Sequence, residues 1–118
     1  MKKNIIKILS ITSIFYCGVT LGQTGWTTST RIFDLRVFNG TQILGQTLDT
    51  NVSEGCPSAS TNFQLTTFLL DLDSPLAQET YSLLLTAQTT GREVQLFRTP
   101  NCNDSNFLRF INGARLRN

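Results

Sequence analysis

The sequence contains no histidine, and this absence removes most of the common catalytic and metal-binding arrangements. Without an imidazole there is no Ser-His or Cys-His nucleophile pair, and none of the usual zinc triads can form. General-base catalysis near neutral pH also loses the side chain that most often performs it. We therefore expect a protein that is not an enzyme and that carries no cofactor and no metal ion.

Lysine is absent from everything beyond residue 22, which removes the basic character of the chain. The whole sequence has 10 Lys and Arg against 8 Asp and Glu, but all three lysines lie near its start. Residues 23–118 keep seven arginines against eight acidic residues, a net charge of −1. Because a nucleic-acid-binding domain needs a strongly basic surface, we expect no nucleic acid among the partners.

Residues 1–22 have the pattern of a secretory signal peptide. Three lysines form a basic start, residues 5–19 form an apolar run, and small residues such as Gly22 follow. Polar residues dilute the run, which favours a cleaved signal over a membrane helix; lipoprotein anchoring through Cys17 is a minor alternative. We expect a signal peptide at 1–22, one domain at 23–118, and a secreted or periplasmic location.

Cys56 and Cys102 are the two cysteines that remain after the signal peptide. An even number of cysteines in an exported protein predicts a disulfide bond between them. Such a bond is typically worth about 2–4 kcal/mol, which matters for a domain with a small core. The alternative, a pair of reactive or metal-binding thiols, lacks supporting histidines.

The rest of the chain has the pattern of β-strands, turns and one helix. Strands are predicted at 31–38, 41–48, 63–72, 92–98 and 107–116. Asn39-Gly40 is a hairpin signal, Gly45 indicates a bulge or bend, and the two apolar faces of 63–72 indicate a central strand. The fold class is mainly β with one helix, and the order predicts an OB-fold-like five-stranded barrel (β-β-β-α-β-β). Generic small α+β sheets share this order.

The predicted helix starts after a cap at Asp73 or Ser74 and ends at Gly91. At 100° per residue its apolar arc is about 200° wide, well beyond the stripe of an ordinary surface helix. Either the helix is sunk deep in its own domain, or one edge is covered by another copy of the chain. In the second case the interface residues are Leu76, Tyr81, Leu84 and Leu85.

The segment "YSLLLTAQTTGREVQLF" carries a resemblance to a known family. Its Tyr-x-Leu-Leu-Leu-x-Ala helix runs into Gly-Arg-x-Val, within residues 76–98. With the signal peptide, the early tryptophan and the two cysteine-bearing loops, it resembles small secreted OB-fold proteins related to the pentameric binding subunits of bacterial exotoxins, such as that of subtilase cytotoxin. The resemblance implies a homo-oligomer, with a pentamer favoured, cell-surface glycans as ligands, and a possible second toxin chain.

Glycan binding requires an aromatic ring for the apolar face of a sugar and planar polar groups for its hydroxyls. Trp26 is a candidate ring, although a single tryptophan more often packs beside a core. Asn101, Asn103 and Asp104 form a polar cluster on the loop of Cys102, although Asn and Asp are common in turns. An arginine can pair with a sialate carboxylate, but spacing singles out none among Arg31, Arg36 and Arg98.

Asp71 and Asp73 are two residues apart, a spacing that places both on one face of a strand. Two carboxylates there can bind a cation or act as the acid and base of a glycosidase. Acids at a strand end and a helix start more often have structural roles. The sequence therefore favours a secreted non-enzymatic binding module with a glycan ligand. The alternative is a periplasmic or envelope protein-interaction or structural module with no sugar ligand.

Overall fold

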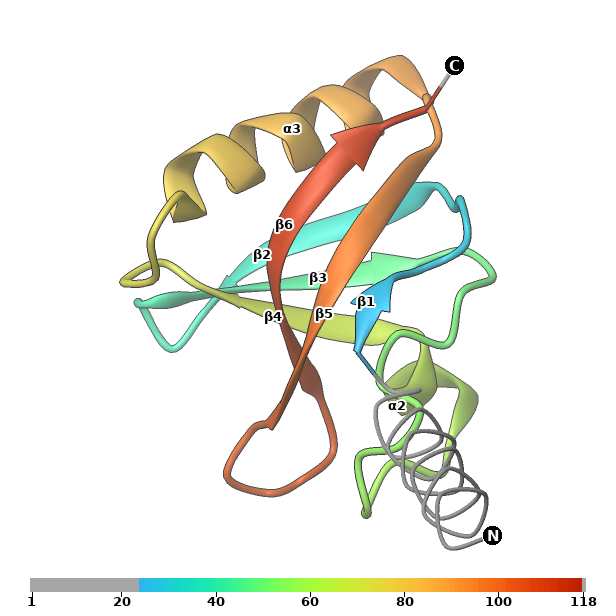
Figure 1. The fold of residues 1–118 in the computed structure, drawn as a ribbon, viewed down its shortest axis with the longest axis vertical. Helices are drawn as coiled ribbons and strands as arrows, with labels where there is room; N and C mark the ends of the chain where they lie inside the picture. Colours follow the sequence, from blue (N-terminus) through green and yellow to red (C-terminus); the bar gives the residue numbers. More distant parts are fainter. Residues whose placement is uncertain (1–23, 118) are drawn as a thin grey trace, which may run out of the picture.

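The computed structural model describes residues 24–117. In chain order the elements are β1 (Gly25–Trp26), β2 (Ile32–Phe38), β3 (Gln42–Thr47), α2 (Asn62–Leu65), β4 (Thr67–Asp71), α3 (Ala77–Thr90), β5 (Val94–Cys102) and β6 (Arg109–Leu116). The protein is mainly β with one long helix, as the sequence predicts. Figure 1 shows α3 across one end of the sheet and the β5–β6 loop at the opposite end.

The strands form one six-stranded sheet in the order β1-β5-β6-β4-β3-β2. All pairs are antiparallel except β4 and β6, which run parallel. The prediction of a five-stranded barrel is therefore wrong in strand number, and the sheet is open in its strand order. The additional strand is β1, where Gly25 pairs with Arg98 and Trp26 with Phe97. A strand of two residues is too short to show an alternating pattern, so the sequence of this segment indicates only a polar stretch without a strand.

The chain between the two edge strands still contacts the sheet. Thr30 forms an isolated antiparallel bridge with Val94 of β5. Their backbone amides and carbonyls exchange hydrogen bonds of 2.9 and 2.8 Å. Thr30 lies two residues before β2, which is one edge strand of the sheet. Strand β5, to which Thr30 is hydrogen-bonded, lies next to β1, the other edge strand.

The β2–β3 hairpin forms where its sequence predicts. Asn39 and Gly40 join the strands with φ values of 56° and 74°, the left-handed conformations that a tight hairpin turn requires. The register then places Phe38 opposite Gln42 and Leu35 opposite Gly45.

The predicted strand at 63–72 is shorter in the structure because its first residues form α2. The Thr61 hydroxyl accepts from the backbone N–H of Gln64, and the Gln64 side chain accepts from the N–H of Thr61. This capping box satisfies donors at the start of a helical turn. It therefore holds residues 62–65 in a helix, and the strand begins only at Thr67.

Helix α3 begins later than its capping residues predict. Its N-cap is Leu76, in a left-handed conformation with φ of 62°, and no side chain caps it. The Asp71 carboxylate instead accepts from the N–H of Asp73 at 2.9 Å, and the Ser74 hydroxyl donates to the Asp71 carbonyl at 2.6 Å. The prediction of Asp73 or Ser74 as the cap is wrong, because both residues belong to the turn after β4. The C-terminal end agrees, with Gly91 left-handed at φ of 69°.

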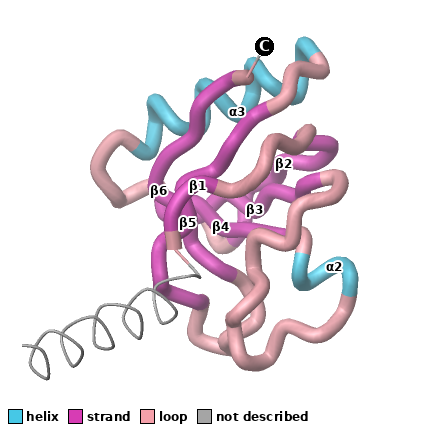
Figure 2. Tube along the Cα trace, turned by 45° about the vertical axis from the view of Figure 1, so that its right-hand side comes forward, coloured by secondary structure: helices cyan, strands magenta, loops and turns pink. Residues whose placement is uncertain are grey.

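The main core is formed by side chains of the sheet and of α3, and Figures 1 and 2 show α3 lying along one side of the sheet. Helix α3 presents Ala77, Thr80, Leu84 and Ala87 to β6, β2 and β4. This spacing is the ordinary stripe of an amphipathic helix. Leu84 is 0% exposed, so it packs in the core of its own chain and presents no surface to a neighbour.

A second, smaller core covers the opposite face of the sheet. It contains Leu44, Leu69 and Leu108, with Phe38 and Phe110 packed against it. The pairs Leu44–Leu69 and Leu69–Phe110 place these side chains in one row across β3, β4 and β6. Strand β4 is therefore covered on both faces, because Phe68 and Leu70 point into the main core. This confirms the prediction of a central strand.

Gly45 is required by the close approach of an aromatic ring. A Cβ atom at this position would lie 2.3 Å from the Phe68 ring atom Cζ, and Phe68 is fully buried. We expect Gly45→Ala to lower the free energy of unfolding by about 1–3 kcal/mol, the usual cost of overpacking, measured by denaturant titration. Gly113→Ala is the matched control, because its Cβ would meet Phe97 at an ordinary 3.4 Å. Equal effects of the two variants would contradict this explanation.

Candidate functional site

The candidate site begins on the face of the sheet that α3 does not cover and extends to the turn before α3. Leu44, Leu69 and Phe110 form an apolar row across β3, β4 and β6. Two residues away on β3 and β4, Gln42 pairs with Asp71 and starts a polar row beside it. An apolar floor therefore borders a line of carboxylate and amide side chains. Two cavities lie along this border, and Phe110 lines both of them.

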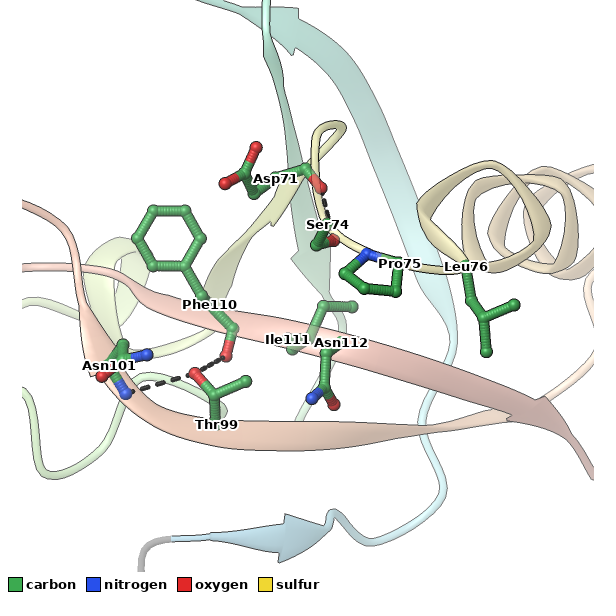
Figure 3. Close-up of a pocket in the computed structure, with 9 residues that line it drawn as sticks. All are labelled: Asp71, Ser74, Pro75, Leu76, Thr99, Asn101, Phe110, Ile111 and Asn112. Atoms are coloured by element: carbon green, nitrogen blue, oxygen red, sulfur yellow. Dashed lines mark hydrogen bonds between the residues drawn. The ribbon is translucent and has the colours of Figure 1, made fainter.

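The larger cavity, called the helix-side cavity here, has a volume of about 490 Å³. Its polar lining consists of Asp71, Ser74, Thr99, Asn101 and Asn112, and its apolar lining of Pro75, Leu76, Phe110 and Ile111. Figure 3 shows these residues coming from the turn before α3 on one side and from β5 and β6 on the other. Its size and its mixture of apolar walls with a few polar groups are typical of small-ligand sites.

Hydrogen bonds fix the β5 wall of this cavity. The Thr99 hydroxyl donates to the Phe110 carbonyl at 2.9 Å and accepts from the Asn101 backbone N–H at 3.2 Å (Figure 3). Asn101 and Asn112 are exposed residues, so their amide groups are accessible to a ligand. The wall thus combines a fixed backbone with accessible amides.

The smaller cavity, called the loop cavity here, has a volume of about 240 Å³. It lies between the β2–β3 turn and the β5–β6 loop, and is lined by Phe38, Asn39, Gln42, Asn103, Asp104, Ser105 and Phe110. Phe110 belongs to both cavities, and Gln42 of the loop cavity is the cross-strand neighbour of Asp71 in the helix-side cavity. The two cavities therefore adjoin, with one aromatic side chain between them.

The structure brings three of the four predicted ligand residues to this region. Asn101 lines the helix-side cavity, whereas Asn103 and Asp104 line the loop cavity. Asn103 also has a structural role, because its Oδ1 accepts from the N–H groups of Phe107 and Leu108 at 3.0 and 3.3 Å. Asp104 is exposed at the rim.

Trp26, the fourth predicted ligand residue, lies at a different cavity. Its ring meets Phe97 edge-on at 5.1 Å, and the Arg115 guanidinium lies 4.2 Å from the ring centre. A third cavity of about 230 Å³, called the tryptophan cavity here, contains Trp26, Arg98 and Glu54 with threonine and asparagine side chains. Arg115 and Phe97 contact the indole, but Trp26 is still 38% exposed.

Among residues 24–117, Arg109 is the one buried charged side chain, at 2% exposure. Its guanidinium donates to the carbonyls of Val52 at 3.1 Å, Glu54 at 2.7 Å and Thr99 at 2.8 Å. Burial lowers the pKa of Arg109, and the positive charge of Arg98 lowers it further. Arginine still keeps its proton in proteins, so a cation lies here among carbonyl groups.

The predicted disulfide is present next to this arginine. Cys56 and Cys102 are joined with a Cα–Cα distance of 5.9 Å, and Cys102 pairs with Arg109 in the β5–β6 register. Arg109 and the disulfide therefore both attach residues 52–56 to the base of the β5–β6 loop. The loop that supplies Asn103 and Asp104 thus leaves from a covalently fixed point.

The predicted interface residues have different environments. Leu76 is 66% exposed and Leu85 is 38% exposed, Tyr81 is half-buried against the main core, and Leu84 is buried. On β2, an edge strand, Phe33 and Val37 are also exposed. An apolar edge therefore remains uncovered within the described residues, but it does not include Leu84.

Sequence reasoning missed Phe110 and treated Asp71 mainly as a strand-end acid. Their importance depends on the parallel pairing of β4 with β6, which brings Leu69 beside Phe110. No local pattern encodes that pairing. The available signal was the pair of apolar faces on β4, which implied that something lies over each face.

Comparison with protein-family models, with curated proteins and with solved structures gave no match to this chain. Within residues 24–117 no helix has the length and apolar character needed to cross a membrane. In the same part of the chain, no three acidic, cysteine or histidine side chains come together as a candidate metal site.

We expect Arg109→Met to reduce the free energy of unfolding by about 3 kcal/mol, because one buried and two partly buried carbonyls lose their charged donor. Arg115→Met is the matched control on the same strand. It removes an exposed contact with Trp26, worth about 0.5–1 kcal/mol, and an exposed hydrogen bond to Oε1 of Gln95. Denaturant titration of both variants, with the disulfide intact, measures their free energies of unfolding. Similar losses in the two variants would show that the carbonyl contacts of Arg109 contribute little.

Proposed function

We propose that this protein is a secreted or periplasmic, non-enzymatic module that binds a glycan at the two cavities beside Phe110. The observation that carries the proposal is the half-buried Phe110 ring between two cavities lined by amide, hydroxyl and carboxylate groups. A sugar has an apolar face and a rim of hydroxyls, and this arrangement offers a partner for each. The disulfide between Cys56 and Cys102 fits a protein that works outside the reducing cytoplasm.

The proposal includes an OB-like relationship for the sheet. Strands β2, β3 and β4 form an antiparallel meander, α3 follows β4, and β4 pairs in parallel with β6. The Thr30–Val94 bridge connects the two edges of this arrangement. OB-folds bind oligosaccharides and oligonucleotides on the face of strands 2–3 and on the loops after strands 1 and 4. Counting from β2, those loops are the β2–β3 turn and the β5–β6 loop, which line the loop cavity.

Binding should depend on the exposed amides of the helix-side cavity. We expect the double variant Asn101→Ala/Asn112→Ala to bind an immobilised glycan array about tenfold or more weakly than the wild type, because each lost hydrogen bond is worth about 1 kcal/mol. Asn62→Ala, an exposed asparagine on α2, is the matched control. Phe110→Leu should also weaken binding, because it keeps apolar volume and removes the ring. Unchanged binding in these variants, or no glycan bound by the wild type, would contradict the proposal.

We further propose that the chain is a homo-oligomer, with a pentamer favoured, in the manner of exotoxin binding subunits, and that it can act with a second toxin or envelope chain. The exposed Leu76 at the N-cap of α3 and the exposed Leu85 within the helix support self-association. The same residues support the alternative function, in which the helix edge binds another envelope protein and no sugar is involved. The second function predicts a fixed protein partner and no signal on a glycan array.

Light scattering on residues 23–118, oxidised, measures the assembly directly. We expect a mass several times that of the monomer for the wild type, and a lower mass for Leu85→Glu, because the charge replaces an apolar contact. Thr86→Glu places the same charge at the next exposed position, 100° around the helix, and should assemble like the wild type. A monomeric wild type would rule out self-association through α3.

A further inference from the structure

The two cavities beside Phe110 carry acidic side chains and no basic ones. Asp71 lines the helix-side cavity and Asp104 lines the loop cavity. None of the arginines in the described part of the chain lines either cavity, and that part contains no lysine. The lining therefore has a formal charge of −2, one from each cavity.

The arginines nearest in the fold are directed to other partners. Arg109 points inward to backbone carbonyls. Arg36 shares the outer sheet face through its pairing with Leu44, but its guanidinium is hydrogen-bonded to Asp34. Arg98 lines the tryptophan cavity instead. An anionic ligand beside Phe110 would therefore meet no neutralising cation.

The Asp71 carboxylate is held in place and remains able to bind. One oxygen, Oδ1, accepts from the backbone N–H of Asp73 at 2.9 Å, which fixes the orientation of the group. An ionised carboxylate has about four acceptor positions, so a single bond leaves capacity for ligand hydroxyls. Asp71 is only half-buried, and Figure 3 shows its carboxylate on the same side of the cavity as the Phe110 ring.

We infer that this site selects uncharged carbohydrate and that Asp71 is the residue that rejects acidic sugars. The inference rests on the proposed glycan-binding function and argues against the pairing of an arginine with a sialate carboxylate that the sequence left open. A neutral sugar donates hydroxyl protons to the carboxylate, and such charge-assisted hydrogen bonds are stronger than neutral ones. A sialic acid or sulfated sugar adds a like charge beside Asp71, and uncompensated like charges across an interface are costly.

The test uses a panel of immobilised neutral glycans, including N-acetyllactosamine, each paired with its α2,3-sialylated derivative at equal density. We expect the wild type to prefer the neutral member about tenfold. Asp71→Asn should weaken neutral binding about fivefold, through loss of a charge-assisted hydrogen bond, and bring the neutral-to-sialylated ratio close to one. The asparagine keeps an acceptor for the Asp73 N–H, so the turn is retained, and the thermal unfolding midpoint checks this.

Asp73→Asn is the matched control. It makes the same change in net charge two residues away, at an exposed side chain that does not line the cavity. This variant should keep both the affinity and the neutral preference. Raising the salt concentration should also reduce the wild-type preference, because the screening length falls from about 10 Å at 0.1 M to about 3 Å at 1 M.

The outcomes separate the inference from the proposed function. Glycan binding with a preference for sialylated members, or with a ratio that Asp71→Asn leaves unchanged, would overturn the inference while glycan binding stands. If Arg98→Gln then removes binding of the sialylated glycans, the tryptophan cavity is the site that binds them. No binding to any member of the panel would overturn the inference and the proposed function together.

Discussion

The contacts of Arg109 with three backbone carbonyls are the interaction on which the rest of the structure depends. The residues around 49–60 form a long connection with little regular structure, and buried carbonyls there need donors. Arg109 supplies donors to Val52 and Glu54, while the Ser53 hydroxyl accepts from the Arg109 backbone N–H and donates to the Thr67 carbonyl. A buried charge is normally costly unless paired. Here carbonyl dipoles solvate it, so the cation connects this segment to β5 and β6, while Ser53 connects it to the start of β4.

Because the Arg109 side chain points into the core, it determines the face to which the next residue, Phe110, points. Successive side chains on a strand point to opposite faces of the sheet, so Phe110 must point outward. It then meets Leu69 of β4 and forms the wall between two cavities. Thr99 connects the two faces, because its carbonyl accepts from Arg109 and its hydroxyl donates to the Phe110 carbonyl. Thr99 therefore links the buried cation to the backbone of Phe110.

The sequence predicted those features that depend on local chemistry. The Asn39-Gly40 turn, the end of α3 at Gly91 and the disulfide follow from backbone conformation and cysteine count. The prediction failed at β1 and at α2, where a short pairing and a capping box outweigh the apolar pattern. For the site, Asn101, Asn103 and Asp104 were found because they share a loop. Phe110 was not, because its position depends on the parallel β4–β6 register, and long-range pairing leaves no periodic signal in either strand.

Leu76 connects the site with the question of what covers α3. A left-handed residue other than glycine costs roughly 1–2 kcal/mol, and at 66% exposure this leucine recovers little from burial in its own chain. A glycine would relieve the strain and would lose the side chain that lines the helix-side cavity. Strained residues of this kind concentrate at functional sites. Under the function proposed above, the leucine contacts a ligand beside Phe110 or a neighbouring copy along α3.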